Sequence, residues 1–165
     1  MDSKLSFGKI TSFERGILAR LLRDAYSFDQ RWDKLYGSSF DEFDDYFYDN
    51  PTIANRCGFI TLYDSEPIGH ISWDPRGLPD FVRIGHNCIA AAYKGRGFGK
   101  LQLQEAIRRI TASDAPMKIV VTTSGSLIAA RHNYESVGFK LMAIRENRED
   151  YFTGDYYDYE YVSGC

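Results

Sequence analysis

The chain has 165 residues, of which 44% are hydrophobic and 26% charged, enough for one hydrophobic core and too few for two. A formal net charge of -3 argues against a nucleic-acid partner, because proteins that bind nucleic acid usually gather basic residues on one face. No stretch reaches the length of a membrane span and the first ten residues lack an apolar core, so we expect a single domain over residues 1–165, located in the cytoplasm, with no membrane partner.

Hydrophobic periodicity predicts a strand and two helices at the start of the chain. A strand over 4–10 precedes a helix that buries apolar residues over 17–25 and has a capping box at 11–14. A second capping box at 39–42 predicts the start of a shorter helix, which ends before Pro51 because the residue preceding a proline disfavours helical backbone.

Three strands follow this helical part. The stretches 57–63 and 67–73 flank a turn at 64–66, which is the pattern of a β-hairpin. A third strand over 81–91 leads directly into a glycine-rich, basic segment.

The glycine-rich segment combines backbone freedom with positive charge, immediately before an amphipathic helix. Glycines at alternate positions allow successive N–H groups to point toward one concavity at a helix N-terminus, where an anion is stabilised. Apolar residues recur at helical spacing from Leu103 to Ile110 and predict that helix. The glycines are Gly95, Gly97 and Gly99, and the basic residues around them are Lys94, Arg96 and Lys100.

The spacing excludes two familiar phosphate-binding loops. A P-loop needs G-x-x-x-x-G-K-[ST], whereas Lys100 is followed by Leu101. A dinucleotide fingerprint needs G-x-G-x-x-G after a first strand, whereas these glycines read G-x-G-x-G in the middle of the chain. A loop that only turns the chain remains the alternative.

The C-terminal part is predicted to alternate strands with one more helix. A β-branched stretch over 117–123 predicts a buried strand, and a helix over 127–137 follows, with Ser126 as its N-cap and Gly138 as its C′ residue. Strands over 141–146 and 156–162 close the chain, and in the last one tyrosines alternate with Asp158 and Glu160, so that one face is aromatic and the other acidic.

Cysteines and histidines are few and scattered, with no spacing typical of a zinc site or a disulfide framework. Cys88 lies in an apolar stretch, where a small buried thiol is the ordinary role. We therefore expect no metal ion and no structural disulfide. The residues concerned are Cys57, Cys88, Cys165, His70, His86 and His132.

Two motifs, in the same order, resemble those of the GNAT superfamily of N-acetyltransferases. The segment 94–99, KGRGFG, is similar to the acyl-CoA pyrophosphate motif Q/R-x-x-G-x-G/A, with Lys94 where Gln or Arg is usual. Ala129 followed by 134–139, YESVGF, resembles the A-x-x-x-x-Y-E-x-x-G-F ending of the family's last helix. The resemblance covers residues 59–139 and implies an α/β (α+β) GNAT fold, a mixed twisted sheet of about seven strands with helices on both faces.

The resemblance also implies acetyl-CoA as co-substrate. In that fold the strands before and after the cradle helix splay apart, and the pantetheine arm lies between them against open backbone. An Asn is common at the position of Ser126, so we expect a weaker or shifted contact there. The expected cofactor-binding residues are Ile89, Ala90, Ala91, Lys94, Gly95, Arg96, Gly97, Phe98, Gly99, Lys100 and Ser126.

Acetyl transfer needs a base for the amine and a proton for the departing thiolate. The resemblance implies that Tyr134 donates that proton, and packing is its alternative role. Many family members place a Glu on the strand before the cradle, where this chain has none, so His86 is the best titratable candidate for the base. The alternative is an inert His86 with water as the base, and His70 and Asp74 are further candidates.

The acceptor is suggested only by charge. Five acidic residues within 41–49 lie on the helix that overhangs the acceptor cleft in the resembled fold, which favours a cationic amine; a solvated acidic face is the alternative. A function of another class also stays open, a catalytically silent acyl-CoA sensor or assembly module, and a homodimer is compatible with either function. The five residues are Asp41, Glu42, Asp44, Asp45 and Asp49.

Overall fold

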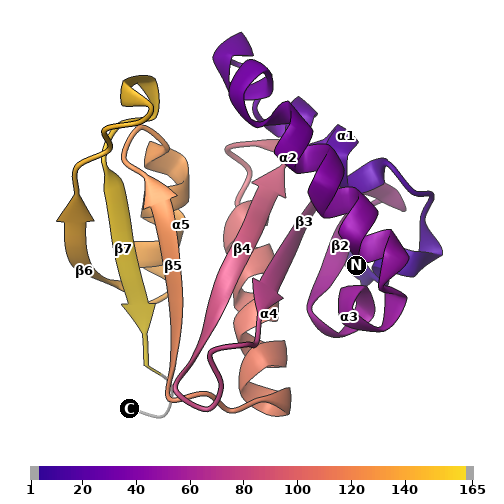
Figure 1. The fold of residues 1–165 in the computed structure, drawn as a ribbon. Coiled ribbons are helices and arrows are strands. Elements are labelled where there is room, and N and C mark those ends of the chain that lie inside the picture. Colours follow the sequence, from indigo (N-terminus) through magenta and orange to yellow (C-terminus); the bar gives the residue numbers. More distant parts are fainter. Residues whose placement is uncertain (1–3, 163–165) are drawn as a thin grey trace. The chain divides into compact units, whose positions relative to one another are not determined.

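The computed structural model describes residues 4–162, which contain a mixed sheet of seven strands in the order β1-β2-β3-β4-β5-β7-β6 (Figure 1). This architecture confirms the predicted fold class. The strands are β1 (Leu5–Gly8), β2 (Gly58–Tyr63), β3 (Glu66–Asp74), β4 (Phe81–Ile89), β5 (Lys118–Ser124), β6 (Lys140–Arg145) and β7 (Tyr156–Tyr161). The helices are α1 (Ile17–Ala25), α2 (Gln30–Asp49), α3 (Pro51–Arg56), α4 (Phe98–Ser113) and α5 (Ile128–Ser136), and three 3-10 turns are η1 (Ile10–Ser12), η2 (Ala91–Tyr93) and η3 (Tyr151–Thr153).

The described chain forms two compact units, one of residues 4–72 and 86–98 and the other of residues 73–85 and 99–162. In the first unit β1 pairs antiparallel with β2, and β2 pairs antiparallel with β3. The predicted hairpin is confirmed, and its turn has positive φ at both Asp64 (52°) and Ser65 (68°), as in the type I′ turns that match strand twist.

The core of the first unit lies between α1, α2 and the sheet. The apolar residues predicted for the first helix are buried on α1, and Phe40 and Phe47 of α2 pack with them. Burial of such side chains contributes about 1.5–3 kcal/mol each, so this face holds α1 and α2 together.

Neither predicted capping box begins a helix. Residues 10–12 form η1, and α1 starts after Gly16, whose φ of 103° only glycine adopts without strain. The N–H groups of Gly16, Leu18 and Ala19 instead donate to the carboxylate of Asp44, at 2.8, 2.9 and 3.3 Å. Asp44 is 2% exposed, so α1 is capped by a buried side chain of α2.

The helix α2 is much longer than predicted. It starts at Gln30 because Asp29 is its N-cap and accepts from the Arg31 N–H at 3.0 Å. Apolar residues at helical spacing, Trp32, Tyr36 and Phe40, were the available signal for this first half. Pro51 does end α2, but it also opens α3, because proline suits the first turn of a helix.

The second unit joins β5, β6 and β7. The parallel ladder between β4 and β5 covers three residues, Phe81–Arg83 opposite Lys118–Val120. β7 pairs antiparallel with both β5 and β6, and α5 packs against this part of the sheet (Figure 1). The two faces predicted for β7 are confirmed: Tyr159 is buried, while Asp158 and Glu160 on the other face accept hydrogen bonds from Arg145 and Lys118.

The boundaries of α5 correct one predicted cap and confirm the other. Leu127 is the N-cap of α5, and no side chain caps it, so Ser126 is not the cap. The N–H of Ser126 donates to the Thr153 carbonyl at 3.0 Å instead. Gly138 has a φ of 111° and ends the helix as the predicted C′ residue.

Among residues 4–162, no helix is long and apolar enough to cross a membrane. Within the same residues, no cluster of three or more potential ligands from His, Cys, Asp or Glu could hold a metal ion.

Candidate functional site

The glycine-rich loop has the backbone that an anion cradle needs. Gly95 and Gly97 have φ values of 75° and 85°, a region that costs other residues about 1–2 kcal/mol. A Cβ built on either glycine meets no other atom within 4 Å, so space is open beside the backbone. Gly99 and Lys100 lie in the first turn of α4, whose N–H groups have no partner within the helix. The loop and this helix start therefore fit a phosphate group.

Two positive side chains of the loop, Arg96 and Lys100, differ in their surroundings. The guanidinium of Arg96 lies 5.1–5.6 Å from the ring centroids of Tyr63, Tyr93 and Phe98, in an aromatic setting that restricts its orientation. Lys100 is exposed.

Lys94 turns toward α1. Its ammonium donates a hydrogen bond to the Ala25 carbonyl and lies 4.7 Å from the centroid of the Phe28 ring. Partial burial there lowers the pKa of Lys94. The Lys94 backbone N–H donates to the Ala91 carbonyl at 3.4 Å, and the charge of Lys94 serves the contact with α1.

The backbone before the loop is less open than predicted. The Ala90 N–H donates to the Ile68 carbonyl at 2.7 Å, and the Ala91 N–H donates to the Asp24 carboxylate at 3.0 Å. These two N–H groups therefore have partners on β3 and at the end of α1, and a contact of the co-substrate with Ala90 and Ala91 stays a prediction. Ile89, the last residue of β4, keeps its expected role as a prediction.

His86 lies in an apolar environment on β4. Its backbone N–H donates to the Ser72 hydroxyl at 3.2 Å, and its ring lies 4.4 Å from that of Phe43, centroid to centroid. Burial lowers the pKa of His86 to about 4, so the imidazole is neutral and weakly basic at neutral pH. A proton from an alkylammonium of pKa about 10 would reach it only at a cost of roughly 8 kcal/mol.

The two further candidates for the base are also engaged. His70 is 1% exposed, and its Nε2–H donates to the Leu18 carbonyl at 3.1 Å. Burial, with a smaller contribution from His86, lowers the pKa of His70 to about 3. Asp74 accepts hydrogen bonds of 2.6–3.0 Å from Arg76, which lower its pKa. Both side chains therefore have structural partners.

Tyr134 lies on α5 inside an aromatic cluster of the second unit. Its ring is 3% exposed and lies 5.4 Å from the ring of Phe139 and 6.0 Å from that of Tyr159. The Tyr159 hydroxyl in turn donates to Glu135 at 2.8 Å. Packing therefore fixes the position of the Tyr134 ring, and proton donation by its hydroxyl stays a prediction. Ser126, before the same helix, is exposed.

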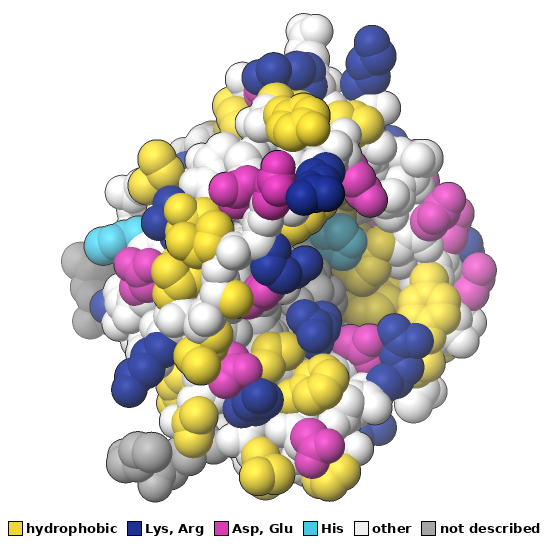
Figure 2. Space-filling model, turned by 60° about the vertical axis from the view of Figure 1, so that its left-hand side comes forward, with side chains coloured by type: hydrophobic (Ala, Val, Ile, Leu, Met, Phe, Trp, Pro, Cys, Tyr) yellow, Lys and Arg dark blue, Asp and Glu magenta, His cyan; other side chains and the backbone are white. Residues whose placement is uncertain are grey.

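The acidic stretch of α2 is partly neutralised, because two arginines pair with three of its five carboxylates. Arg15 binds Asp45 and Asp49, each at 2.9 Å, and Arg23 binds Asp41 with two hydrogen bonds of 2.8 Å. Asp44 is buried as the cap of α1. Figure 2 shows acidic and basic side chains interspersed over the face that it displays. A charge count along the helix missed these partners, because both arginines come from the neighbouring segment.

Comparison with known proteins adds an independent finding. Residues 19–139 match the family model described as Acetyltransferase (GNAT) family. No curated protein sequence matches this chain.

Solved structures share the fold at low sequence identity. A GNAT family acetyltransferase from Elizabethkingia anophelis with acetyl-CoA bound superposes with a TM-score of 0.68 at 17% identity, covering 98% of this chain and 99% of that one. The ribosomal-protein-S18-alanine N-acetyltransferase from Escherichia coli gives a TM-score of 0.71 at 16% identity, covering 98% and 95%. RimL, a ribosomal L7/L12 alpha-N-protein acetyltransferase in complex with coenzyme A, gives 0.75 at 16%, covering 98% and 95%.

Proposed function

Because the chain belongs to the GNAT acetyltransferase family and uses acetyl-CoA as its co-substrate, we propose that it transfers the acetyl group directly to a primary amine in a ternary complex. The observation that carries this proposal is the loop around Gly95 and Gly97, with positive φ, open space and a helix start, inside the segment that matches the family. In the proposal, backbone N–H groups over 95–100 hold the pyrophosphate.

The proposed reaction forms a bond between the amine nitrogen and the thioester carbonyl carbon and breaks the carbon–sulfur bond. Tyr134 is the proposed proton donor to the departing thiolate, since a phenol of pKa about 10 can protonate a thiolate of pKa about 8.5. The N–H of Ile89 is the proposed oxyanion donor. Because its pKa is near 4, His86 is too weak a base to deprotonate an alkylammonium. We therefore propose that the amine arrives neutral and that water takes the proton that its nitrogen loses after the attack.

The charge of the acceptor depends on how much negative charge the acidic stretch keeps. Four of the five carboxylates in the acidic stretch that favoured a cationic amine are paired with Arg15 or Arg23 or cap α1, but two arginines offset only part of its negative charge. We therefore propose a primary amine as acceptor, and the remaining negative charge favours a cationic one.

The first experiment is a thermal shift with acetyl-CoA. At 100 times Kd the ligand adds about 2.7 kcal/mol to the unfolding free energy, which corresponds to a rise in Tm of about 5–10 °C for a domain of this size. Gly97→Val should abolish the rise, because its side chain enters the open space beside the loop.

Gly16→Val is the matched control. Gly16 also has positive φ and open space around a built Cβ, but it lies at the start of α1. Both variants should lose some basal Tm through backbone strain, and only Gly97→Val should lose the response to acetyl-CoA. Release of CoA thiol with a panel of amines then tests turnover. An unaltered Tm of the parent protein with acetyl-CoA would contradict the proposal, and binding without turnover of any amine would favour the silent sensor.

A further inference from the structure

The segment that leads into the glycine-rich loop is tied to the end of α1. The Ala91 N–H donates to the Asp24 carboxylate at 3.0 Å, and the Lys94 ammonium donates to the carbonyl of Ala25, the last residue of α1. Between these two points lies η2, which a hydrogen bond of 3.4 Å from the Lys94 N–H to the Ala91 carbonyl closes. Both ends of this short turn are therefore fixed to the same helix terminus, within the first unit.

Asp24 stands where a helix disfavours an acidic residue. It lies in the last turn of α1, beside the negative end of the helix dipole, where a carboxylate is destabilising and a cation is stabilising. Compensation comes from outside the helix, since Lys94 places its ammonium at this terminus and the charges of Asp24 and Lys94 attract each other. Helix formation alone therefore does not account for Asp24, whereas its contact with Ala91 does.

An aromatic ring holds Lys94 on a second side. The ammonium lies 4.7 Å from the centroid of the Phe28 ring, which is a cation–π distance. Partial burial lowers the pKa of Lys94, and the charge of Asp24 opposes that decrease. With a carbonyl, a carboxylate and a ring around it, the ammonium has a defined position at the end of α1.

The glycines after Lys94 have no such support. A Cβ built on Gly95 or Gly97 meets no atom within 4 Å, so no neighbouring segment stands beside the backbone there. Both have positive φ, one of several conformations open to glycine in a free loop. The direction of the loop's N–H groups therefore depends on its anchors, which are Arg96 among the aromatic rings and residues 91–94 on α1.

We propose that Asp24 and Lys94 are positioning residues for acetyl-CoA: they anchor 91–94 to α1, and the anchored loop presents its N–H groups to the pyrophosphate. The inference rests on the proposed binding of the pyrophosphate by 95–100. A loop that already has its binding conformation avoids the entropy cost of being ordered by the ligand, so loss of the anchor weakens binding. In this role both side chains act through the backbone of the loop, and the charge of Lys94 stays with α1.

The sign of the effect at Asp24 separates this role from simple electrostatics. Acetyl-CoA carries negative phosphate groups, so by charge alone the loss of Asp24 would tighten binding and the loss of Lys94 would weaken it. A Lys94 that turned to the pyrophosphate would give the same signs, because the loss of Asp24 would release the ammonium. When the two residues form an anchor, the loss of either one weakens binding.

Four variants test the anchor by calorimetric titration with acetyl-CoA. Asp24→Ala removes the acceptor of the Ala91 N–H, and Lys94→Met removes the donor to Ala25 while it keeps a long side chain. Asp24→Asn keeps an acceptor oxygen and Lys94→Arg keeps a cationic donor, so these two are the conservative replacements.

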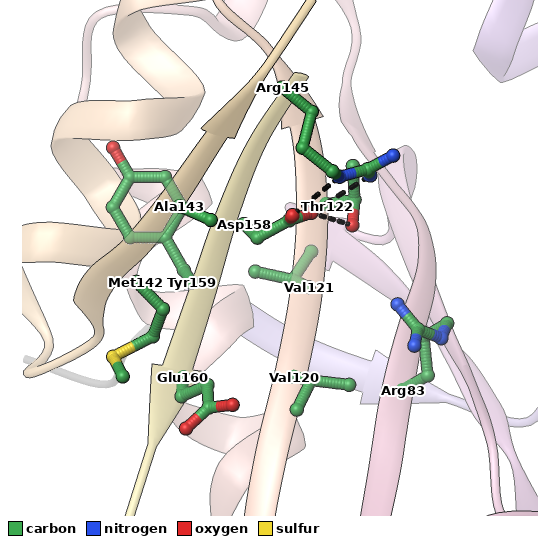
Figure 3. Close-up of a pocket in the computed structure, with 10 residues that line it drawn as sticks. All are labelled: Arg83, Val120, Val121, Thr122, Met142, Ala143, Arg145, Asp158, Tyr159 and Glu160. Atoms are coloured by element: carbon green, nitrogen blue, oxygen red, sulfur yellow. Dashed lines mark hydrogen bonds and ion pairs between the residues drawn. The ribbon is translucent and has the colours of Figure 1, made fainter.

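Two controls remove a carboxylate elsewhere. Asp33→Ala removes a negative charge from α2 in the first unit, where Asp33 pairs with Arg23. Asp158→Ala removes a carboxylate that lines a cavity of about 420 Å³ in the second unit, where Arg145 and Thr122 hold it (Figure 3). The first variant controls for the lost charge, and the second for the loss of a structural hydrogen-bond network.

Asp24→Ala and Lys94→Met should each raise the Kd of acetyl-CoA about tenfold, which corresponds to about 1.4 kcal/mol. The double variant should raise it no further than the single variants do, because both remove the same anchor. The two conservative replacements and the two controls should keep the parental Kd. In turnover, the loss should appear in the KM of acetyl-CoA and leave kcat at saturating acetyl-CoA unaltered.

Circular dichroism shows whether each variant is folded at the temperature of the titration, so that a raised Kd is distinguished from a loss of folded protein. An unaltered or lower Kd in Asp24→Ala would overturn the inference. So would additive effects in the double variant, the absence of rescue by Asp24→Asn and Lys94→Arg, or an equal rise in Kd in Asp158→Ala. If the parent protein itself does not bind acetyl-CoA, the proposed function fails instead.

Discussion

Asp44 offers a sharp test of how the first unit is held together. Its carboxylate accepts three N–H groups at the start of α1, and the side chain is almost fully buried. Asp44→Asn keeps the size of the side chain, removes the charge and replaces one acceptor oxygen with a donor. That new NH₂ then faces a backbone N–H of Gly16, Leu18 or Ala19.

The cost can be estimated from these contacts. Loss of an N-cap costs about 1 kcal/mol, a charge at a partly buried helix terminus contributes up to about 2 kcal/mol, and an unpaired buried N–H costs about 1–3 kcal/mol. These contributions overlap, so we expect a decrease of about 3 kcal/mol in the free energy of unfolding. At about 2–4 °C per kcal/mol for a domain of this size, Tm should fall by about 6–12 °C.

Urea denaturation followed by circular dichroism measures this decrease, and the neighbouring Asp45→Asn is the control. The side chain of Asp45 is 61% exposed and pairs with Arg15, an exposed ion pair worth about 0.2–1 kcal/mol. If Asp44→Asn unfolds at the same urea concentration as Asp45→Asn, the assignment of Asp44 as the cap of α1 is wrong.

Two further predictions concern titratable and hydroxyl groups. Tyr134→Phe keeps the ring among Phe139 and Tyr159 and removes only the hydroxyl, so kcat should fall by about 10² to 10⁴ with the KM of acetyl-CoA unchanged; a parental rate would assign Tyr134 to packing alone. The folded-state pKa values of His70 (about 3) and His86 (about 4) lie below the unfolded value of about 6.5, so the unfolded state binds more protons. The free energy of unfolding should therefore fall as the pH falls from 6.5 toward 4. The decrease should reach up to about 1.4 kcal/mol per pH unit for each histidine. Urea titrations at pH 7.5 and 5.0 check this, and His70→Gln should make the dependence shallower; a slope equal to the parental one would contradict the burial of a neutral His70.

Local signals in the sequence predicted most of the elements correctly. Alternation and turn residues located the β2–β3 hairpin, whose Asp64 and Ser65 adopt left-handed backbone, and Gly138 marked the end of α5. The first capping box, at 11–14, failed for a physical reason. A Ser or Thr three residues before a Glu is a weak local competitor when a buried carboxylate from position 44 already satisfies the N–H groups of α1.

In the candidate site, too, local conformation was predicted correctly and contacts between distant segments were missed. The KGRGFG segment predicted where backbone would adopt positive φ, at Gly95 and Gly97, because that property belongs to the residues themselves. The partner of Lys94 and the partial neutralisation of the acidic stretch by Arg15 and Arg23 depend on contacts between distant segments. No spacing rule along one segment contains that information.

The contacts between the cradle and α1 bear on protein engineering. Asp24 and Ala91 are 67 residues apart in the chain, and Lys94 and Ala25 are 69 apart, yet both pairs are joined by hydrogen bonds. A loop graft that transplanted only 91–100 into a related scaffold would leave Asp24 and Ala25 behind, and with them the acceptors of the Ala91 N–H and the Lys94 ammonium. The transferable module is therefore the loop together with the last turn of α1, and recombination breakpoints placed between them would separate residues that fold as one.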